Sequence, residues 1–256
     1  MKRVVIVGGA GRMGQAMAEN LGAMPDLSVS ALVDLNEPRE TFGAHYVQHL
    51  SDVDPSTVDV VVDFSNPEGV VASAEWCAQH ERGLVVGATG LSEAQRARVA
   101  AAGERTGVVI ASNYSIGAVL AERFAAMAAP YFSRVEIIEL HHDRKVDAPS
   151  GTSLATAQGI IDARRRAGLN PMDDPTQRFT LEGTRGGDAG DGVKIHSVRL
   201  PGLVAHQEVL FGGPGEGLTI RHDSFDRTSF VQGVALAVRA VSSSAKFTVG
   251  IDSLIE

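Results

Sequence analysis

Short runs of β-branched and other apolar residues recur through the first 111 residues of the chain. Apolar runs of this length are typical of strands that are covered on both faces, as in a parallel sheet. The segments between several of them carry apolar residues at helical spacing and predict helices over 13–23, 69–80 and 92–106. The predicted strands are 4–7, 28–33, 58–64, 84–86 and 108–111. This alternation predicts an α/β fold with a Rossmann-type, doubly wound parallel sheet. Over 38–54 the pattern weakens, and we assign no element there.

A glycine-rich turn joins the first predicted strand to the first predicted helix. Its residues Gly9, Gly11 and Gly14 have the G-x-G-x-x-G spacing of dinucleotide-binding turns. Small residues let the backbone approach a pyrophosphate, whose charge is stabilised by amide groups and by the positive end of the helix. Asp34 ends the next strand, where a carboxylate can accept hydrogen bonds from ribose hydroxyls. A tight turn and a strand-end aspartate are the simpler interpretation, but the strand-to-helix context favours a cofactor site. The predicted contacts here are Gly8, Gly9, Ala10, Gly11, Arg12, Met13 and Asp34.

Polar or glycine-rich residues also follow three later strands of the predicted sheet, at 64–67, 87–90 and 111–114. Ligands of open parallel sheets bind outside the carboxyl ends of the strands, where these loops would lie. Each segment taken singly is an ordinary loop, but their common position predicts contacts with the nicotinamide and its ribose. The predicted residues are Gly87, Ala88, Thr89, Ser112, Asn113 and Tyr114.

The densest polar run of the chain covers residues 141–152 and follows a segment, 135–140, that alternates as a strand does. His141, His142 and Lys145 could donate protons or hold carboxylates. The sequence Ser-Gly-Thr at 150–152 precedes a predicted helix over 154–167, whose N-terminal amides form an anion site. A solvated loop with a helix cap is the alternative, but it does not account for the two histidines and the lysine. We expect no metal here, because adjacent histidines point apart in an extended segment. The run therefore suits a small acidic substrate.

The second half of the chain predicts a different architecture. A helix over 118–129 and strands over 193–199, 204–211 and 218–222 indicate an inserted α+β domain with an antiparallel-rich sheet. The uncovered face of such a sheet would be a natural oligomer surface. We expect 1–114 plus 227–256 to form the dinucleotide-binding domain and 115–226 to form a substrate-binding domain. The glycine-rich segment 183–192 is predicted to be a mobile loop.

Composition excludes several classes of protein. With 44% apolar and 21% charged residues, a chain of 256 residues can bury one or two cores without disulfides. The formal net charge of −8 argues against nucleic acid as a partner. Cys77 lies in an apolar-periodic stretch, so we expect a buried thiol rather than a nucleophile. Because no apolar run has membrane-spanning length and no targeting pattern is present, we expect a cytoplasmic protein without a membrane partner.

Five motifs make the chain resemble the 4-hydroxy-tetrahydrodipicolinate reductases, also called dihydrodipicolinate reductases, of bacterial lysine and diaminopimelate synthesis. The resemblance runs essentially from end to end, and the polar run is its most specific part. The residues at 197–209 and 219–230 look like the actinobacterial branch, in which A-H-Q-E replaces a more common G-E-H version. The motifs are V-G-G-A-G-R-M-G at 7–14, D-F-S-N-P-E-G at 63–69, G-A-T-G at 87–90, S-N-Y-S-I-G at 112–117 and E-L-H-H-D-R-K-V-D-A-P-S-G-T at 139–152.

The resemblance implies hydride transfer from NADH or NADPH to a cyclic imine dicarboxylate, formed by dehydration, to give tetrahydrodipicolinate. By motif position, His141 is the proton donor and acceptor, and Lys145 is a proton donor and substrate contact. The resemblance also implies a homotetramer, with 115–226 as the substrate-binding and tetramerisation domain. Residues at substrate-binding positions of the motif are His142, Lys145, Gly151 and Thr152.

Two questions stay open from the residues. Asp34 would repel the 2′-phosphate of NADPH, whereas Arg12 and Arg39 could compensate for it, so we expect use of both cofactors with NADH preferred. The alternatives to this reductase are another two-domain dehydrogenase, of the aspartate or homoserine type, and a non-catalytic NAD-binding protein. The first would lack the run at 141–152, and His141 with Lys145 argues against the second.

Overall fold

The computed structural model describes residues 1–241 and 245–255, and the chain divides into two compact units. Unit 1 comprises Met1–Ile116 and Arg227–Glu256, and unit 2 comprises Gly117–Asp226. This division lies within two residues of the boundaries expected from the sequence, while the roles expected for the two parts stay predictions. The predicted C-terminal segment 227–256 includes residues 242–244 and 256, which lie outside the described residues.

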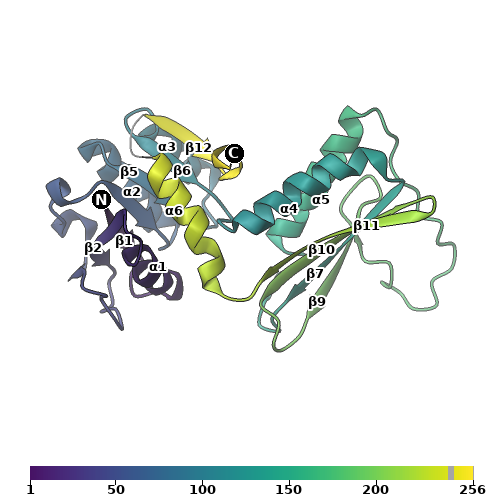
Figure 1. The fold of residues 1–256 in the computed structure, drawn as a ribbon, viewed down its shortest axis with the longest axis horizontal. Coiled ribbons are helices and arrows are strands. Elements are labelled where there is room, and N and C mark those ends of the chain that lie inside the picture. Colours follow the sequence, from purple (N-terminus) through teal and green to yellow (C-terminus); the bar gives the residue numbers. More distant parts are fainter. Residues whose placement is uncertain (242–244, 256) are drawn as a thin grey trace. The chain divides into compact units, whose positions relative to one another are not determined.

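Unit 1 is built on a parallel sheet in the order β12-β6-β5-β4-β1-β2-β3 (Figure 1). The central strands β1, β4, β5 and β6 consist largely of fully buried valines, isoleucine and leucine, because helices cover both faces. The predicted Rossmann-type sheet is therefore confirmed. Its strands are β1 (Lys2–Val7), β2 (Leu27–Val33), β3 (His45–Val47), β4 (Val60–Asp63), β5 (Gly83–Val86), β6 (Gly107–Ile110) and β12 (Lys246–Val249).

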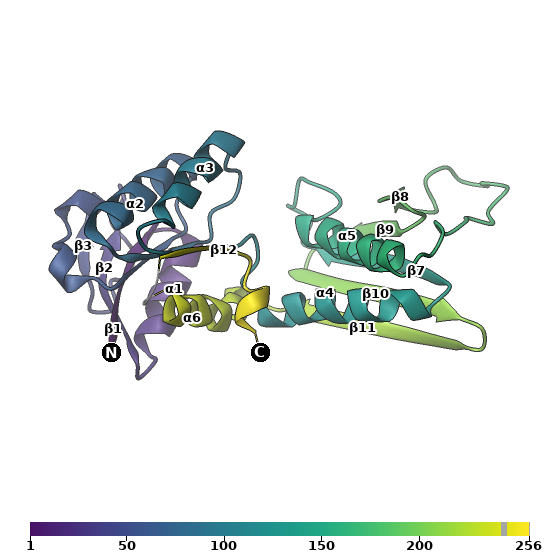
Figure 2. The same cartoon turned by 90° about the horizontal axis from the view of Figure 1, so that it is seen from above.

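Four helices pack on this sheet. Helices α1 (Arg12–Gly22) and α6 (Val231–Ala240) contact each other, and α2 (Pro67–His80) pairs with α3 (Glu93–Ala102) (Figure 2). The Asn66 side chain accepts a hydrogen bond from Gly69 at the start of α2, and Ser92 forms a capping box with Gln95 at the start of α3. Short 3-10 helices occur at Leu50–Asp52, Pro55–Thr57, Ala129–Tyr131, Arg227–Phe230 and Asp252–Leu254.

Unit 2 has a mixed sheet in the order β11-β10-β7-β9-β8, in which only the β7/β9 pair is parallel among the described strands. Helices α4 (Ile116–Ala128) and α5 (Gly151–Arg166) contribute alanines and isoleucines to its core, against Ile137, Val209 and Phe211. The expected loop at 183–192 contains the short strand β8, which pairs with β9. The strands are β7 (Arg134–His141), β8 (Gly187–Asp188), β9 (Lys194–Arg199), β10 (Ala205–Gly213) and β11 (Glu216–Ser224).

Candidate functional site

The predicted cofactor residues of unit 1 lie at the carboxyl ends of its central strands. Strand β1 pairs with β2 on one side and with β4 on the other, so the chain reverses its direction across the sheet between β1 and β4. Such a switch point is the usual ligand site of a doubly wound sheet. The structure brings the turn after β1 to this edge together with the loops after β4, β5 and β6.

The glycine turn is built so tightly that side chains do not fit into it. Gly8 has a φ of +81°, and a Cβ atom there would lie 2.9 Å from the carbonyl carbon of Phe64. A Cβ atom on Gly14 would lie 2.1 Å from the carbonyl oxygen of Gly8. Because Gly11 caps α1 without a side chain, the first turn of the helix can present its amides to an anion. The turn is therefore tight, and the start of α1 beside it can offer backbone amides to an anion.

Asp34 lies directly beside this turn. Its Oδ2 accepts a hydrogen bond of 3.0 Å from the Ala10 amide, and its Oδ1 accepts one from Asn36. The carboxylate thus fixes the turn and stays half-buried at the edge of the sheet. The Gln15 side-chain amide donates hydrogen bonds to the carbonyl oxygens of both Gly9 and Glu40. These bonds connect the segment that carries the exposed Arg39 to the start of α1. No sequence pattern predicted this tether.

The loops after β5 and β6 contain the other predicted cofactor contacts. Gly87 lies against the Phe64 ring, where a Cβ atom would approach the ring to 2.0 Å. Tyr114 is almost fully buried, and its hydroxyl donates to the carbonyl oxygen of Val86 at 2.7 Å. The side chain of Tyr114 therefore packs inside unit 1, so a cofactor could contact this residue only through its backbone. Ala88, Thr89, Ser112 and Asn113 lie in the same two loops.

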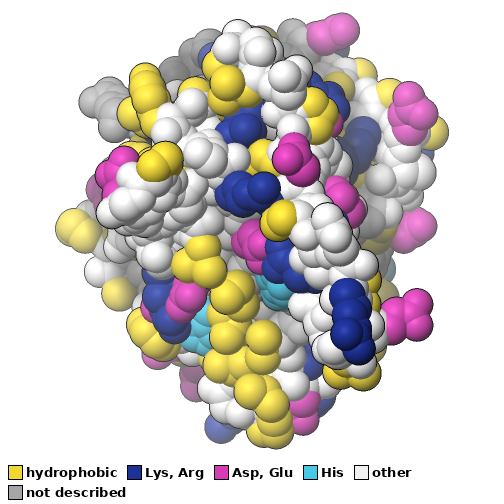
Figure 3. All heavy atoms as spheres, turned by 90° about the vertical axis from the view of Figure 1, so that its right-hand side faces the viewer, with side chains coloured by type: hydrophobic (Ala, Val, Ile, Leu, Met, Phe, Trp, Pro, Cys, Tyr) yellow, Lys and Arg dark blue, Asp and Glu magenta, His cyan; other side chains and the backbone are white. Residues whose placement is uncertain are grey.

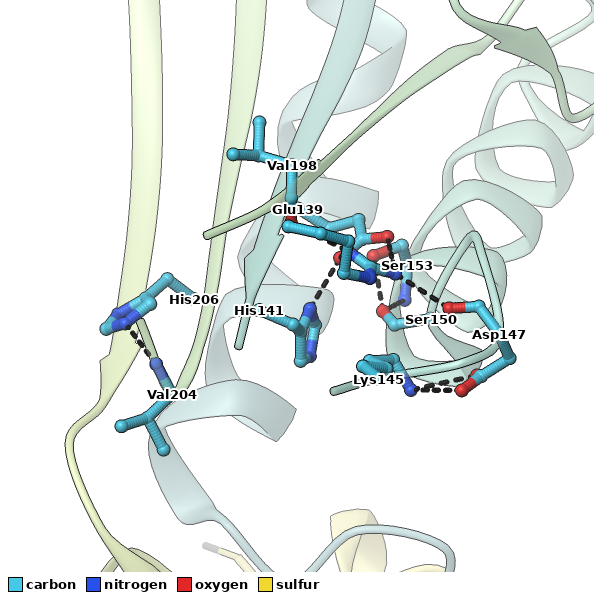
Figure 4. Close-up of polar contacts among 10 residues, drawn as sticks. Glu139, His141, Lys145, Asp147, Ser150, Ser153, Val198, Val204 and His206 are labelled. Carbon is cyan, nitrogen blue, oxygen red and sulfur yellow. Dashed lines mark hydrogen bonds and ion pairs between the residues drawn. The ribbon is translucent and has the colours of Figure 1, made fainter. Parts of the chain in front are cut away.

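In unit 2, strand β7 ends at His141, which begins the polar run. The imidazole is largely buried, and its Nδ1 lies 2.5 Å from Oε2 of Glu139, two residues earlier on the same strand (Figure 4). Glu139 is fully buried, and Arg199 from β9 donates to both of its carboxylate oxygens, at 2.7 and 2.8 Å. His141 is thus held by a charged pair inside the sheet, while its Nε2 is left for other partners.

Lys145 lies in the loop between β7 and α5. Its ammonium group contacts both carboxylate oxygens of the exposed Asp147 at 2.8 Å (Figure 4). Ser150 caps α5 by accepting a hydrogen bond from the Ser153 amide, so the helix begins at Gly151 as the predicted anion site requires. The expected helix over 154–167 therefore begins three residues earlier, at the cap. A Cβ atom on Gly151 would meet open space, so this helix end is accessible.

The remaining predicted substrate residues surround these groups. Thr152 lies in the first turn of α5, and its carbonyl oxygen accepts a hydrogen bond from Thr156. The Nδ1 atom of His142 is buried without a hydrogen-bond partner among the described residues. A buried polar atom of this kind is costly unless a ligand or a water satisfies it, which fits a binding position. The structure thus places His141 at the end of β7, His142 and Lys145 in the loop that follows, and Gly151 and Thr152 at the start of α5.

Burial and the neighbouring charges together determine the pKa of His141. Burial lowers the pKa of His141 below its ordinary value, and the Lys145 and Arg199 cations act in the same direction, while Glu139 opposes them. Burial alone would raise the pKa of Glu139, but hydrogen bonds from Arg199, Ser197 and His141 outweigh it and hold the pKa low. Glu139 is therefore a carboxylate at neutral pH, and the surroundings of His141 favour its neutral form.

Other features of the sequence have structural roles. Cys77 is fully buried, as expected, and burial raises the pKa of its thiol, so it is no nucleophile. Within residues 1–241 and 245–255, no three His, Cys, Asp or Glu side chains gather in a way that could hold a metal ion. Among the described helices, none has both the length and the apolar character needed to cross a membrane.

Sequence reasoning missed Glu139 and Arg199 as parts of the site. Glu139 was visible in principle, because positions 139 and 141 of one strand point to the same face. Arg199 lies 60 residues away from Glu139 in sequence, and only the pairing of β7 with β9 brings the two together.

Two features together define a two-domain nicotinamide-dependent reductase. One is the glycine turn at the switch point of the parallel sheet in unit 1, and the other is a histidine and a lysine beside a helix N-terminus in unit 2. Family profiles agree: residues 2–114 match the one described as "Dihydrodipicolinate reductase, N-terminus", and residues 117–255 match "Dihydrodipicolinate reductase, C-terminus". The chain belongs to the dihydrodipicolinate reductase family.

Relatives with the name 4-hydroxy-tetrahydrodipicolinate reductase cover nearly the whole chain. The protein of Nocardia farcinica is 47% identical over 99% of this chain and 98% of its own length. That of Mycolicibacterium smegmatis is 47% identical over 99% of both chains. A solved structure, the dipicolinate-bound dihydrodipicolinate reductase from Paenisporosarcina sp. TG-14, covers all of both chains with 37% identity and a TM-score of 0.88. The predicted family and its resemblance to actinobacterial members are confirmed.

A more distant likeness concerns one of the alternatives considered above. The aspartate dehydrogenase from Thermotoga maritima has a TM-score of 0.52 over 95% of this chain, with 15% identity. At this identity the likeness shows a shared fold only, and it carries no information about substrate.

Proposed function

We propose that this protein reduces 4-hydroxy-tetrahydrodipicolinate, by way of its dehydrated form, to tetrahydrodipicolinate in the synthesis of diaminopimelate and lysine. The observation that carries the proposal is the cluster of His141, Lys145 and the α5 N-terminus at one end of unit 2. A cation and a helix N-terminus together suit a dicarboxylate. The relative from Paenisporosarcina, whose structure is described as dipicolinate-bound, supports this class of substrate.

The residues of unit 2 would divide the work between binding and proton transfer. Lys145 would bind one substrate carboxylate in place of Asp147, whose exposed carboxylate holds the ammonium group in the unliganded protein. The Gly151 amide and the Thr152 hydroxyl would bind a carboxylate at the positive end of α5. His141 would deliver the proton through Nε2, because its Nδ1 contacts Glu139. The unpartnered Nδ1 of His142 would gain a partner from the substrate.

The glycine turn and the strand-end loops of unit 1 would hold NADH or NADPH. Gly8 and Gly14 let the turn pack tightly, since Cβ atoms there would collide with backbone, and the α1 N-terminus beside the turn would offer amides to the pyrophosphate. When bound, the nicotinamide supplies the hydride. Asp34 favours NADH, and Arg12 and Arg39 would permit NADPH, so we propose use of both with NADH preferred. This preference would be wrong if kcat/KM for NADPH exceeded that for NADH by about tenfold or more.

A coupled assay tests the proposed activity. The freshly made condensation product of pyruvate and aspartate semialdehyde is mixed with the protein and NADH, and the loss of reduced nicotinamide absorbance is followed. Oxidation well above the background without protein supports the proposal. Tight NADH binding without oxidation would instead favour the non-catalytic alternative.

We further propose a homotetramer that works in the cytoplasm. Helices α4 and α5 cover one face of the five-stranded sheet, and Ile138, Leu140 and Leu210 lie half-buried on its other face. On the side of the molecule drawn in Figure 3, hydrophobic side chains lie among Lys, Arg, Asp and Glu side chains. Light scattering after size exclusion should give four times the chain mass of 26.9 kDa, and cell fractionation would test the location. A monomer mass would contradict the tetramer.

A further inference from the structure

Strand β7 carries a carboxylate, that of Glu139, beside Nδ1 of His141, the histidine that the proposed reaction uses. Glu139 is fully buried, and its Oε2 lies 2.5 Å from His141 Nδ1. Residues 139 and 141 point to the same face of the strand, so the contact follows directly from the extended backbone. The imidazole therefore has one nitrogen committed to the protein.

Arg199 holds this carboxylate from the neighbouring strand. Its Nη1 donates to Glu139 Oε2 at 2.8 Å, and its Nη2 donates to Oε1 at 2.7 Å, which is a bidentate pair. The same Nη2 donates to the backbone carbonyl of Asp147 at 2.8 Å. One guanidinium thus contacts the partner of His141 and also the loop whose Asp147 carboxylate binds Lys145.

An ionised carboxylate only accepts hydrogen bonds, so the nitrogen facing it must carry a hydrogen. In neutral His141 the hydrogen then lies on Nδ1, and Nε2 carries the lone pair that exchanges a proton with a substrate. When Nε2 is protonated, the same carboxylate stabilises the imidazolium. The loop cation Lys145 and the Arg199 guanidinium are the other charges near the ring, and both oppose that protonation.

We propose that Glu139 and Arg199 are positioning residues: Glu139 fixes the tautomer of His141 and stabilises its protonated form, and Arg199 holds Glu139 and the Lys145 loop in one arrangement. The inference rests on the proposed function for the role of His141. Arg199 makes the two groups that the proposed reaction needs dependent on each other, because the same guanidinium contacts Glu139 and the Asp147 backbone.

The chain offers a matched control for the kinetic test. Glu136, on the same strand, contacts His196 Nε2 at 2.8 Å and pairs with Arg185 on the opposite face of the sheet, which repeats the Glu, His and Arg combination away from His141. We expect Glu139→Gln to lower kcat by about 100-fold, with KM changed by less than about fivefold. Glu136→Gln should leave kcat within about twofold of wild type. Arg199→Lys should lower kcat and raise KM, because the Asp147 contact is lost as well. Wild-type kcat in folded Glu139→Gln would overturn the proposal.

The tautomer can be read without substrate. In the full-length protein labelled with ¹⁵N-histidine, ¹H–¹⁵N correlation spectra distinguish Nδ1–H from Nε2–H, and His141→Gln identifies the signal. We expect Nδ1–H in wild type and in Glu136→Gln, and a loss of this preference in Glu139→Gln. Dominant Nε2–H in wild type would overturn the proposal, even if Glu139→Gln does not fold. Failure of the proposed function is distinguishable, because wild type would then show the expected tautomer but no substrate-dependent NADH oxidation.

Discussion

Gly14→Ala tests whether the glycine turn is a cofactor cradle. The added Cβ atom would lie 2.1 Å from the Gly8 carbonyl oxygen and 2.8 Å from Gly9 Cα, and both of these are backbone atoms that cannot rotate away. An ordinary contact requires more than about 3.2 Å, so the turn and the start of α1 must separate by roughly 1 Å. Overpacking of this kind costs about 1–3 kcal/mol of folding free energy.

The larger effect concerns cofactor affinity. A shift of roughly 1 Å lengthens hydrogen bonds from the turn and the α1 N-terminus to a pyrophosphate beyond their useful range. Each hydrogen bond to a charged group contributes about 1.5–3 kcal/mol, so the loss of two costs at least about 3 kcal/mol. The Kd for NADH should therefore rise by about 150-fold or more.

Gly22→Ala is the matched control for this experiment. Gly22 is the last residue of the same helix, and a Cβ atom there would meet only Val29, at an ordinary 3.8 Å. NADH binding is measured by titration calorimetry and folding by circular dichroism. We expect Gly22→Ala to bind like wild type and Gly14→Ala to bind far more weakly while folded. A Kd for folded Gly14→Ala within about threefold of wild type would show that NADH does not bind against the turn.

Three further predictions concern unit 2. His141→Gln should lower kcat by about 100-fold or more with little change in KM, because the proton donor is lost but the contacts with the substrate carboxylates are kept. Wild-type kcat in this variant would remove His141 from the mechanism. Lys145→Ala should lower kcat and raise KM in steady-state assays, since the ammonium group is expected to bind substrate as well as to assist proton transfer; an unchanged KM would contradict the binding role. Because burial lowers the pKa of His141 and the acid form is required, kcat/KM should fall as pH rises through that lowered pKa. A bound substrate dianion favours the imidazolium form of His141, so kcat should fall at a higher pH than kcat/KM does. A fall of kcat at a lower pH than that of kcat/KM would contradict the assignment of His141 as the acid.

Local patterns were sufficient to predict the central strands of unit 1. Strands β1, β4, β5 and β6 are short, rich in valine and covered on both faces, so periodicity and composition agree. Strand β3 was missed because its three residues, one exposed and two half-buried at a sheet edge, form no apolar run. The parallel pairing of β12 with β6 was also missed, because it joins residues that are about 139 positions apart in sequence.

Local sequence patterns likewise indicated only part of the candidate site. The polar run from His141 to Thr152 could be identified because its residues are close in sequence and end at a helix cap. The ion pair of Glu139 with Arg199 depends on the register of β7 with β9, which no local pattern encodes. The burial of Tyr114, which lies in the loop after β6, likewise depends on tertiary contacts such as its hydrogen bond to Val86 at the end of β5. A single sequence therefore indicates which chemical groups are available, whereas the contacts that orient them come from tertiary pairing.

The most direct measurement of the central claim follows the hydride itself. The protein is incubated with the pyruvate and aspartate semialdehyde condensation product and with NADH deuterated at its transferable position, and the product is analysed by mass spectrometry. We expect tetrahydrodipicolinate that carries a single deuterium from the cofactor, with this product strongly reduced in His141→Gln. Consumption of NADH without deuterium in tetrahydrodipicolinate, or no consumption at all, would contradict this expectation.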